Sequence, residues 1–206
     1  MIETFPDVSV ELIKEAVRAC HKYVGSLEAQ YLERSAWRAK NGYPVLSYQG
    51  LGRSGKDTAA QHIAELSELK YGGSTSNVVL PLIAHSLGIP EDEAWDTRHK
   101  NRTFWFNWCN LFRQLYGQET LARYLLGLGD FVVGLRSDIE VRAVHKAGLV
   151  THWVWVERPG VADDPTVEFD WKLIQSLHGM RLSNDGALAP YLEKVRAHAW
   201  MAGLAV

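Results

Sequence analysis

Cysteine is scarce in this chain of 206 residues, where only Cys20 and Cys109 are present. Two cysteines so far apart, with no Cys-x-x-Cys spacing, exclude a disulfide framework and a cysteine-based zinc site. We expect both to be buried thiols in a reducing compartment. The eight histidines also lack the spacing of metal ligands.

Long apolar runs are missing too. No stretch approaches the roughly 18 uninterrupted apolar residues that a membrane-spanning helix needs. The N-terminal residues place no basic segment before an apolar run, so they do not resemble a secretion signal. We therefore expect a soluble, unexported protein of the cytoplasm, with no membrane partner.

A strong net charge is the third absence, because 22 Lys and Arg residues face 24 Asp and Glu residues, for a formal net charge of −2. This balance provides no global basic field and argues against a DNA-coating protein, although it allows a local basic groove. Internal repeats and low-complexity linkers are also absent. Because 47% of the residues are hydrophobic, the chain can bury one sizeable core, and we predict a single domain over residues 1–206.

The most informative feature that is present is the run Gly50-Leu-Gly-Arg-Ser-Gly-Lys56-Asp57-Thr58. It follows a strand-like segment at 44–48 and precedes a helix-like segment at 59–66, which is the context that a phosphate-binding P-loop requires. The glycines let successive backbone N–H groups point inward, and the new helix adds its positive end. We predict a nucleoside triphosphate site whose loop residues are Gly50, Gly52, Arg53, Ser54, Gly55, Lys56 and Thr58.

Within this loop, Lys56 supplies a mobile point charge for the outer phosphates. The position after the lysine normally carries the Ser or Thr that binds magnesium, but here it carries Asp57, and Thr58 comes one residue later. Asp57 can organise the metal or accept a proton from an acceptor hydroxyl. The alternative is a helix N-terminal residue that merely suits the helix dipole.

Residues 1–43 precede the loop as an N-terminal extension. Apolar residues recur with helical periodicity over 9–39, which predicts amphipathic helices. We favour a role in packing or in homodimer formation over substrate binding, because amphipathic helices usually bury their apolar stripe.

The rest of the chain alternates between strands and helices. We predict a short strand that opens into a turn at 69–77, a helix at 77–87 capped by Asn77, a helical region from 90 to 117, and a helix at 119–126. There follow a doubly buried strand at 130–136, a helix at 138–146, a strand at 151–158, a loop at 159–165, a helix at 167–177, a strand at 180–183 and a terminal helix. This order predicts an α/β fold with a parallel sheet and helices on both faces.

Four motifs together resemble the phage-type deoxynucleoside monophosphate kinases of the P-loop kinase superfamily. They are Gly-Lys-Asp-Thr in the loop, Val-Val-Gly-Leu-Arg136 followed by Glu140, the strand ending Glu-Arg-Pro-Gly160, and Leu-Ser-Asn-Asp-Gly186. The resemblance covers roughly residues 44–200. It implies a core of about five parallel strands, a helical acceptor region at about 77–128 and a mobile lid at about 159–170.

The same resemblance implies roles for single residues. Lys56 would hold the phosphates of ATP, Asp57 and Thr58 would organise Mg²⁺, Arg136 would face the transferring phosphate, and Arg158 would lie at the lid. Two departures concern the acceptor: Gly134 stands where the family usually has Asp, and the turn at 71–76 differs from its base-binding segment.

Cations suit phosphoryl transfer because they cancel charge on phosphate oxygens. Arg98 and Arg102 are four residues apart and are expected to share one helical face. Arg113 and Arg123 can approach from neighbouring helices, although each is equally well read as a solvated surface charge. The predicted acceptor site comprises Ser74, Thr75, Ser76, Arg98, His99, Arg102 and Arg113.

Tryptophan recurs in the same region, and Trp95, Trp105 and Trp108 could stack on a base. Their spacing also suits an ordinary buried helix face, and we predict that at least two of the three belong to the core. Trp153 and Trp155 share one side of their strand and are predicted to pack against the sheet.

The predicted function is ATP-dependent phosphorylation of a deoxynucleoside monophosphate or a related modified pyrimidine nucleotide. The resemblance leaves open a phage kinase that phosphorylates the 5-hydroxymethyl group of hydroxymethyluracil within DNA, which would place the protein in the host cytoplasm. A nucleotide-binding regulatory module is the non-enzymatic alternative, and the arginines between 98 and 113 argue against it.

Overall fold

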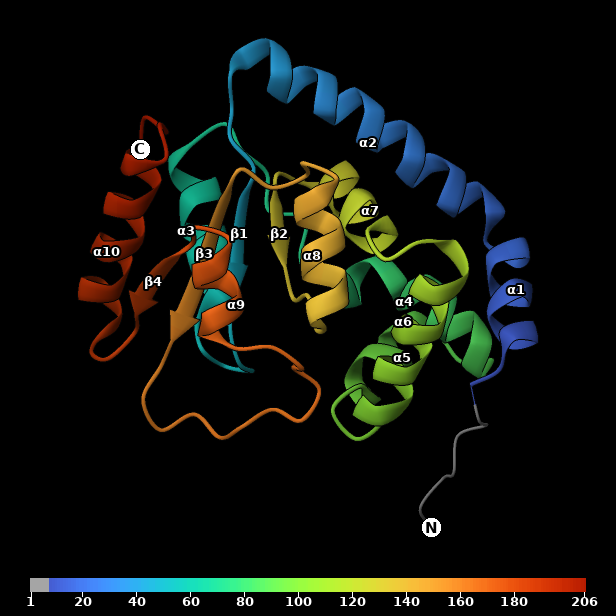
Figure 1. Ribbon diagram of the computed structural model, residues 1–206. Coiled ribbons are helices and arrows are strands. Elements are labelled where there is room, and N and C mark those ends of the chain that lie inside the picture. Colours follow the sequence, from blue (N-terminus) through green and yellow to red (C-terminus); the bar gives the residue numbers. More distant parts are fainter. Residues whose placement is uncertain (1–7) are drawn as a thin grey trace.

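The computed structural model describes residues 8–206, so the first seven residues of the predicted extension lie outside it. Within the described residues, four strands form one parallel sheet in the order β2-β1-β3-β4 (Figure 1). The strands are β1 (Leu46–Gln49), β2 (Phe131–Val133), β3 (His152–Glu157) and β4 (Met180–Ser183). The predicted α/β class and parallel sheet are confirmed.

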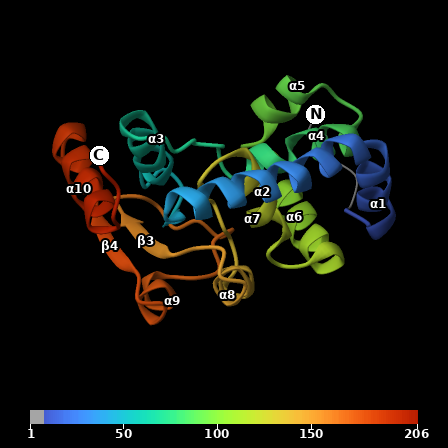
Figure 2. The ribbon, with the colours of Figure 1, turned by 90° about the horizontal axis from the view of Figure 1, so that it is seen from above.

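Helices cover both faces of this sheet (Figure 2). Helices α3 (Lys56–Leu66) and α10 (Leu188–Met201) pack on one face around Tyr48 and Val154. Helices α8 (Asp138–Lys146) and α9 (Trp171–Ser176) pack on the other face around Trp153 and Trp155. The predicted packing role of these two tryptophans is therefore confirmed.

The prediction of about five strands is wrong, because the segment after α3 does not join the sheet. The Lys70 carbonyl oxygen accepts a hydrogen bond from the Asp130 N–H at 2.8 Å. The Lys70 N–H, however, donates to the Asp130 carboxylate at 2.7 Å instead of to a strand carbonyl. Gly73, with φ +89°, then turns the chain toward the next helix. The ladder therefore stops after one backbone bond.

The remaining helices form a second cluster beside the sheet. They are α1 (Val10–Ala19), α2 (His21–Asn41), α4 (Thr75–Leu87), α5 (Glu91–Thr97), α6 (Arg102–Tyr116) and α7 (Thr120–Leu128). Their shared core includes Ile13, Leu27, Leu82, Trp108 and Leu125, all fully buried. The N-terminal helices therefore pack onto the helices of the predicted acceptor region, and a homodimer stays a prediction.

One buried carboxylate ties the N-terminal extension to the sheet. Asp130, directly before β2, is fully buried and forms ion pairs with Arg34 and Arg38 of α2. Arg38 also donates to the carbonyl oxygens of Leu126 and Gly129 at 3.1 and 3.0 Å. Each charge therefore has several partners, as a buried ionic group requires.

Several predicted boundaries move for local reasons. The helices expected over 9–39 are α1 and α2, which meet at Cys20, where the backbone leaves the helical region. The helix expected from Asn77 begins at Thr75, because Ser74 is its N-cap and Asn77 completes a capping box as the third helical residue. The helix expected from 167 begins only at Trp171, since the Asp170 side chain caps it.

The helical region from 90 to 117 is two helices, separated by a turn at 98–101. Trp105 and Trp108 of α6 are buried, whereas Trp95 of α5 is only partly buried, which confirms a core role for two of the three. Cys20 and Cys109 are free and only partly buried, so the expectation of buried thiols is met only in part.

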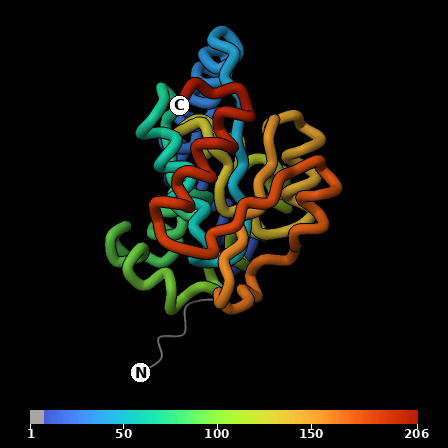
Figure 3. Tube along the Cα trace, turned by 90° about the vertical axis from the view of Figure 1, so that its left-hand side faces the viewer, coloured from blue at the N-terminus to red at the C-terminus, as the bar shows by residue number. Residues whose placement is uncertain are grey.

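The carboxyl ends of the strands lie together at one end of the molecule. The turn between α5 and α6 and the long loop after β3 also meet there (Figures 1 and 3). In open α/β sheets, ligands bind at this end of the strands. No helix among residues 8–206 is long and apolar enough to cross a membrane.

Candidate functional site

The loop between β1 and α3 has the backbone conformation that its glycines permit. Gly50 has φ +144°, Arg53 has φ +63° and Gly55 has φ +103°. A Cβ on Gly50 would lie 2.3 Å from the Val156 carbonyl oxygen, and one on Gly55 would lie 2.6 Å from Asn184 Nδ2. Both glycines are therefore required by conformation and by space, and they let the loop wrap around the N-terminus of α3.

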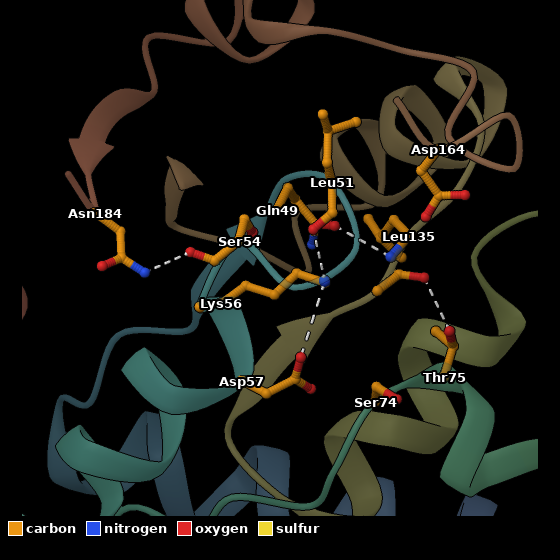
Figure 4. A network of polar contacts seen from close by, with 12 residues as sticks. Gln49, Leu51, Ser54, Lys56, Asp57, Ser74, Thr75, Leu135, Asp164 and Asn184 are labelled. Atoms are coloured by element: carbon orange, nitrogen blue, oxygen red, sulfur yellow. Dashed lines mark hydrogen bonds and ion pairs between the residues drawn. The ribbon is translucent and has the colours of Figure 1, made fainter. Parts of the chain in front are cut away.

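Lys56 is the first residue of α3, and its side chain is turned back across the loop (Figure 4). Its ammonium group donates to the Leu51 carbonyl oxygen at 3.1 Å and lies 3.9 Å from Asp57 Oδ2. Burial lowers the pKa of Lys56, and the charges of Arg136 and Arg102 lower it further, against the opposing pull of Asp57 and Asp164. A lysine 6% exposed beside backbone N–H groups is well placed to meet an anion.

Residues near the C-terminus fasten the loop. Asn184 Nδ2 donates to the Ser54 carbonyl oxygen at 2.8 Å, and the Tyr191 hydroxyl donates to the Gly55 carbonyl oxygen at 2.8 Å. The Ser54 hydroxyl is buried and has no hydrogen-bond partner within the described chain. Asn184 lies in a motif noted in the sequence, whereas Tyr191 carried no sequence signal.

A cavity of about 470 Å³ adjoins this loop. It brings Arg53 and Thr58 of the predicted nucleoside triphosphate site together with Arg158 of the predicted lid, which follows β3 about a hundred residues later. The other lining residues are Gly55, Asp57, Asn184, Gly186, Leu188 and Tyr191. The cavity thus combines cationic, polar and apolar groups beside the predicted phosphate loop.

Asp57 lies in the first turn of α3, with its carboxylate half-exposed. The Tyr71 hydroxyl donates to its Oδ1 at 2.7 Å. Thr58 follows it and is exposed. No group of three or more His, Cys, Asp or Glu side chains among residues 8–206 could hold a metal. Asp57 and Thr58 nevertheless suit Mg²⁺, which usually takes one or two protein oxygens and fills its other positions with water and substrate phosphates.

Arg136 follows β2 and Arg102 begins α6, and the structure brings both to one carboxylate. Arg136 Nη1 lies 3.0 Å from Asp164 Oδ2, and Arg102 Nη2 contacts the same oxygen. Asp164 belongs to the loop after β3, within the predicted lid. Asp164 was not among the predicted site residues, because a single aspartate in a polar loop carries no distinguishing signal.

Arg98 and His99 lie in the turn between α5 and α6, so the expectation that Arg98 and Arg102 share one helical face is wrong. The Arg98 guanidinium stacks on the Trp95 ring, 3.8 Å from its centroid. Burial lowers the pKa of Arg98, the Asp57 charge opposes this, and Arg102 and Arg136 add to it. Arg98 therefore belongs to the same electrostatic cluster, whereas His99 is exposed.

Arg113 is only 2% exposed and forms an ion pair with Glu140 of α8 at 2.9 Å. The same Glu140 carboxylate accepts a hydrogen bond from the Arg136 backbone N–H at 2.8 Å. Arg113 therefore holds the carboxylate that binds the Arg136 backbone, and it is buried in an ion pair instead of being exposed to an acceptor as predicted. Arg123 has a half-exposed side chain, 3.9 Å from Glu119, in keeping with a solvated charge.

The three hydroxyl residues predicted at the acceptor site lie at the N-terminus of α4. Thr75 is buried and donates to the Gly134 carbonyl oxygen at 2.9 Å, Ser74 caps the helix, and Ser76 is partly exposed. A Cβ on Gly134, which has φ +90°, would lie 3.3 Å from Ser74 Cβ. Both the positive φ and this close approach favour glycine at position 134.

Comparisons with protein-family models, with curated proteins and with solved structures found no match to this chain.

Proposed function

We propose that this chain is an ATP-dependent phosphotransferase that acts on a deoxynucleoside monophosphate or a related modified pyrimidine nucleotide. The observation that carries this proposal is the glycine-built loop around the buried Lys56, with Arg102 and Arg136 converging on the same place. Phosphoryl transfer depends mainly on positioning and on cancelling phosphate charge, and these groups supply both.

ATP supplies the γ-phosphoryl group: an acceptor oxygen bonds to the γ-phosphorus as the bond to the β–γ bridging oxygen breaks and ADP leaves. The loop N–H groups and Lys56 hold the donor phosphates. Arg136 and Arg102 stabilise the charge on the transferring group. Arg53 and Arg158 line the cavity beside the loop, where the rest of the donor binds. Asp57 and Thr58 would hold Mg²⁺, which neutralises phosphate charge when bound.

The role of Asp57 depends on the acceptor. A monophosphate attacks through a phosphate oxygen that is already ionised, so no proton has to be removed. A hydroxymethyl group attacks through a hydroxyl, whose proton must pass to a base, and Asp57 is the carboxylate beside Lys56. If Asp57 acts as this base, Asp57→Asn should slow phosphorylation of a hydroxyl acceptor far more than phosphorylation of a monophosphate, whereas equal losses with both acceptors would assign Asp57 to Mg²⁺ alone.

The decisive experiment incubates the protein with labelled ATP, Mg²⁺, a panel of deoxynucleoside monophosphates and DNA that contains hydroxymethyluracil. Lys56→Ala should reduce transfer by at least about 100-fold, because it removes the cation from the phosphates. Lys146→Ala, at an exposed position of α8, is the matched control. Near-normal phosphoryl transfer by Lys56→Ala would contradict the proposal that this loop binds the phosphates of ATP.

A salt titration separates the acceptors. If DNA is the acceptor, several backbone phosphates are bound, so activity should fall steeply between about 50 and 200 mM salt through counterion release. A free monophosphate should show a much shallower decline. Labelling of DNA but of no free nucleotide would replace our first choice with the DNA kinase.

A further inference from the structure

Asp164 is the buried anion of the lid. Its carboxylate is only 3% exposed, and both guanidinium groups that reach it meet the same oxygen, Oδ2. Its other oxygen, Oδ1, accepts hydrogen bonds from the Thr166 backbone N–H at 3.1 Å and from the Thr166 hydroxyl at 2.7 Å. Burial raises the pKa of Asp164, but the Thr166 hydrogen bonds and the charges of Arg136 and Arg102 outweigh it and hold the pKa below its usual value.

This carboxylate lies directly on the predicted phosphate loop. A Cβ on Gly52 would be 3.2 Å from Asp164 Oδ2 and 3.5 Å from Arg102 Nη2. The Lys56 ammonium group is also within electrostatic range of Asp164 and of both arginines. Figure 4 shows Asp164 beside the loop that surrounds Lys56. The carboxylate therefore joins Arg102 and Arg136 beside the loop that surrounds Lys56.

The groups that hold Asp164 are those that proteins use for phosphates. Guanidinium groups bind carboxylate and phosphate oxygens with the same geometry. Without an anion here, Lys56, Arg102 and Arg136 would repel one another across the loop. Asp164 offers one negative charge, whereas a nucleotide phosphate offers up to two negative charges. The phosphate also has more oxygens that can accept hydrogen bonds.

The chain is exposed before Asp164 and is anchored after it. The Glu168 N–H donates to the Arg136 carbonyl oxygen at 2.7 Å, which anchors the loop after Asp164. On the other side, residues 158–160, 162 and 163 are exposed. Arg102 is itself 43% exposed at its side chain. A small movement of this exposed stretch can withdraw Asp164 while the anchor at Glu168 stays in place.

We propose that Asp164 is a displaceable internal anion, which holds Arg102 and Arg136 in the absence of substrate and is exchanged for a phosphate group of the bound nucleotide. This inference rests on the proposed function and deepens it, since it states that a phosphate group of the nucleotide binds between Arg102 and Arg136. It also makes the lid a competitor of the substrate, because each phosphate that binds must first replace the carboxylate.

The test measures binding of tripolyphosphate by titration calorimetry at constant ionic strength. Asp164→Asn should bind the probe about tenfold more tightly than the parent, because a charged competitor has been removed. Asp163→Asn makes the same change of charge at an exposed neighbouring position and should stay within about twofold. Thr166→Val, which loosens the hold on Asp164, should tighten binding by about two- to threefold.

The direction of the effect separates this proposal from a purely structural role. If Asp164 only braces the lid, Asp164→Asn weakens binding or leaves it unchanged, and either result overturns the proposal. If the parent transfers phosphate but neither Asp164→Asn nor Thr166→Val gains affinity, only this inference fails. If neither the parent nor Asp164→Asn binds tripolyphosphate, both this inference and the proposed function fail.

Discussion

The Tyr71 hydroxyl donates a hydrogen bond of 2.7 Å to Oδ1 of Asp57, and so joins the segment after α3 to the first turn of that helix. Burial raises the pKa of Tyr71, and the neighbouring Asp57 charge and this hydrogen bond raise it further. Tyr71 therefore stays protonated and keeps its donor over the physiological range. Because Oδ1 is held in this way, Oδ2 faces Lys56.

We predict that Tyr71→Phe lowers phosphoryl transfer about tenfold while the Michaelis constant for ATP changes little. A hydrogen bond to a charged group contributes about 1.5–3 kcal/mol, and here it positions a carboxylate instead of binding the donor. Steady-state kinetics with varied ATP measures both constants.

Tyr43→Phe is the matched control, because the Tyr43 hydroxyl also donates to a carboxylate, Glu68, at 3.1 Å but away from the loop. It should leave turnover within about twofold. Equal effects of the two substitutions would contradict a positioning role for Tyr71.

The buried pair between Arg113 and Glu140 leads to a second prediction. Arg113→Ala should lower the free energy of unfolding by about 3–5 kcal/mol, because it leaves the Glu140 carboxylate buried without its cation. Urea unfolding measures this. Arg142→Ala removes an exposed partner of Asp138 at 3.8 Å and should cost less than about 0.5 kcal/mol. An Arg113→Ala protein that is stable but binds the acceptor poorly would instead support the original substrate role.

The local patterns of the chain predicted most of the fold. The helix at 138–146 and the strand at 180–183 match their predicted bounds, because amphipathic periodicity and short apolar runs report on neighbouring residues. The glycine-rich loop was also predictable, since Gly50 and Gly55 adopt the positive φ values that the loop conformation requires. The missing fifth strand was not, because it depends on the Asp130 carboxylate some sixty residues away taking the Lys70 N–H.

The candidate site was predictable only in part, for a similar reason. The sequence of an amphipathic helix does not tell whether its arginine contacts a ligand or a buried carboxylate. Arg113 pairs with Glu140, which lies on another helix. Asp164, Tyr71 and Tyr191 reach the loop from distant segments. Their roles arise from tertiary packing, which leaves no trace in local spacing.

His198 leads to a third prediction, on stability and pH. His198 belongs to α10 and is 3% exposed, and its Nδ1 atom lies 3.3 Å from the Tyr48 hydroxyl oxygen. Burial, with a contribution from the His152 charge, lowers the pKa of His198 to about 4. Between about pH 6.5 and 4, the unfolded chain therefore binds a proton that the folded chain does not, and stability falls as pH falls.

The loss across this window is on the order of 3 kcal/mol, and it is absent above about pH 6.5. Urea unfolding at pH 7.5, 6 and 5 measures it. His198→Leu should flatten this pH dependence, whereas His85→Gln, at an exposed position in α4, should leave it unchanged. If the stability of the parent protein is constant over this pH range, the pKa of His198 is not lowered by folding.

The last prediction concerns Asp130, through which the N-terminal helices are joined to the sheet. Its carboxylate takes Arg34, Arg38 and the Lys70 N–H, so three segments converge on one buried charge. Asp130→Asn keeps the shape but removes the charge, and should lower the free energy of unfolding by about 3–5 kcal/mol, since two arginines then lack their anion.

Asp170→Asn is the control, because Asp170 is an exposed N-cap of α9 and asparagine caps a helix as well as aspartate does. Hydrogen exchange adds a spatial readout. If α2 depends on this link, Asp130→Asn should speed exchange in His21–Asn41 far more than in Asp138–Lys146. Equal acceleration in both helices would mean that Asp130 supports the whole fold and is not a specific tie between the extension and the sheet.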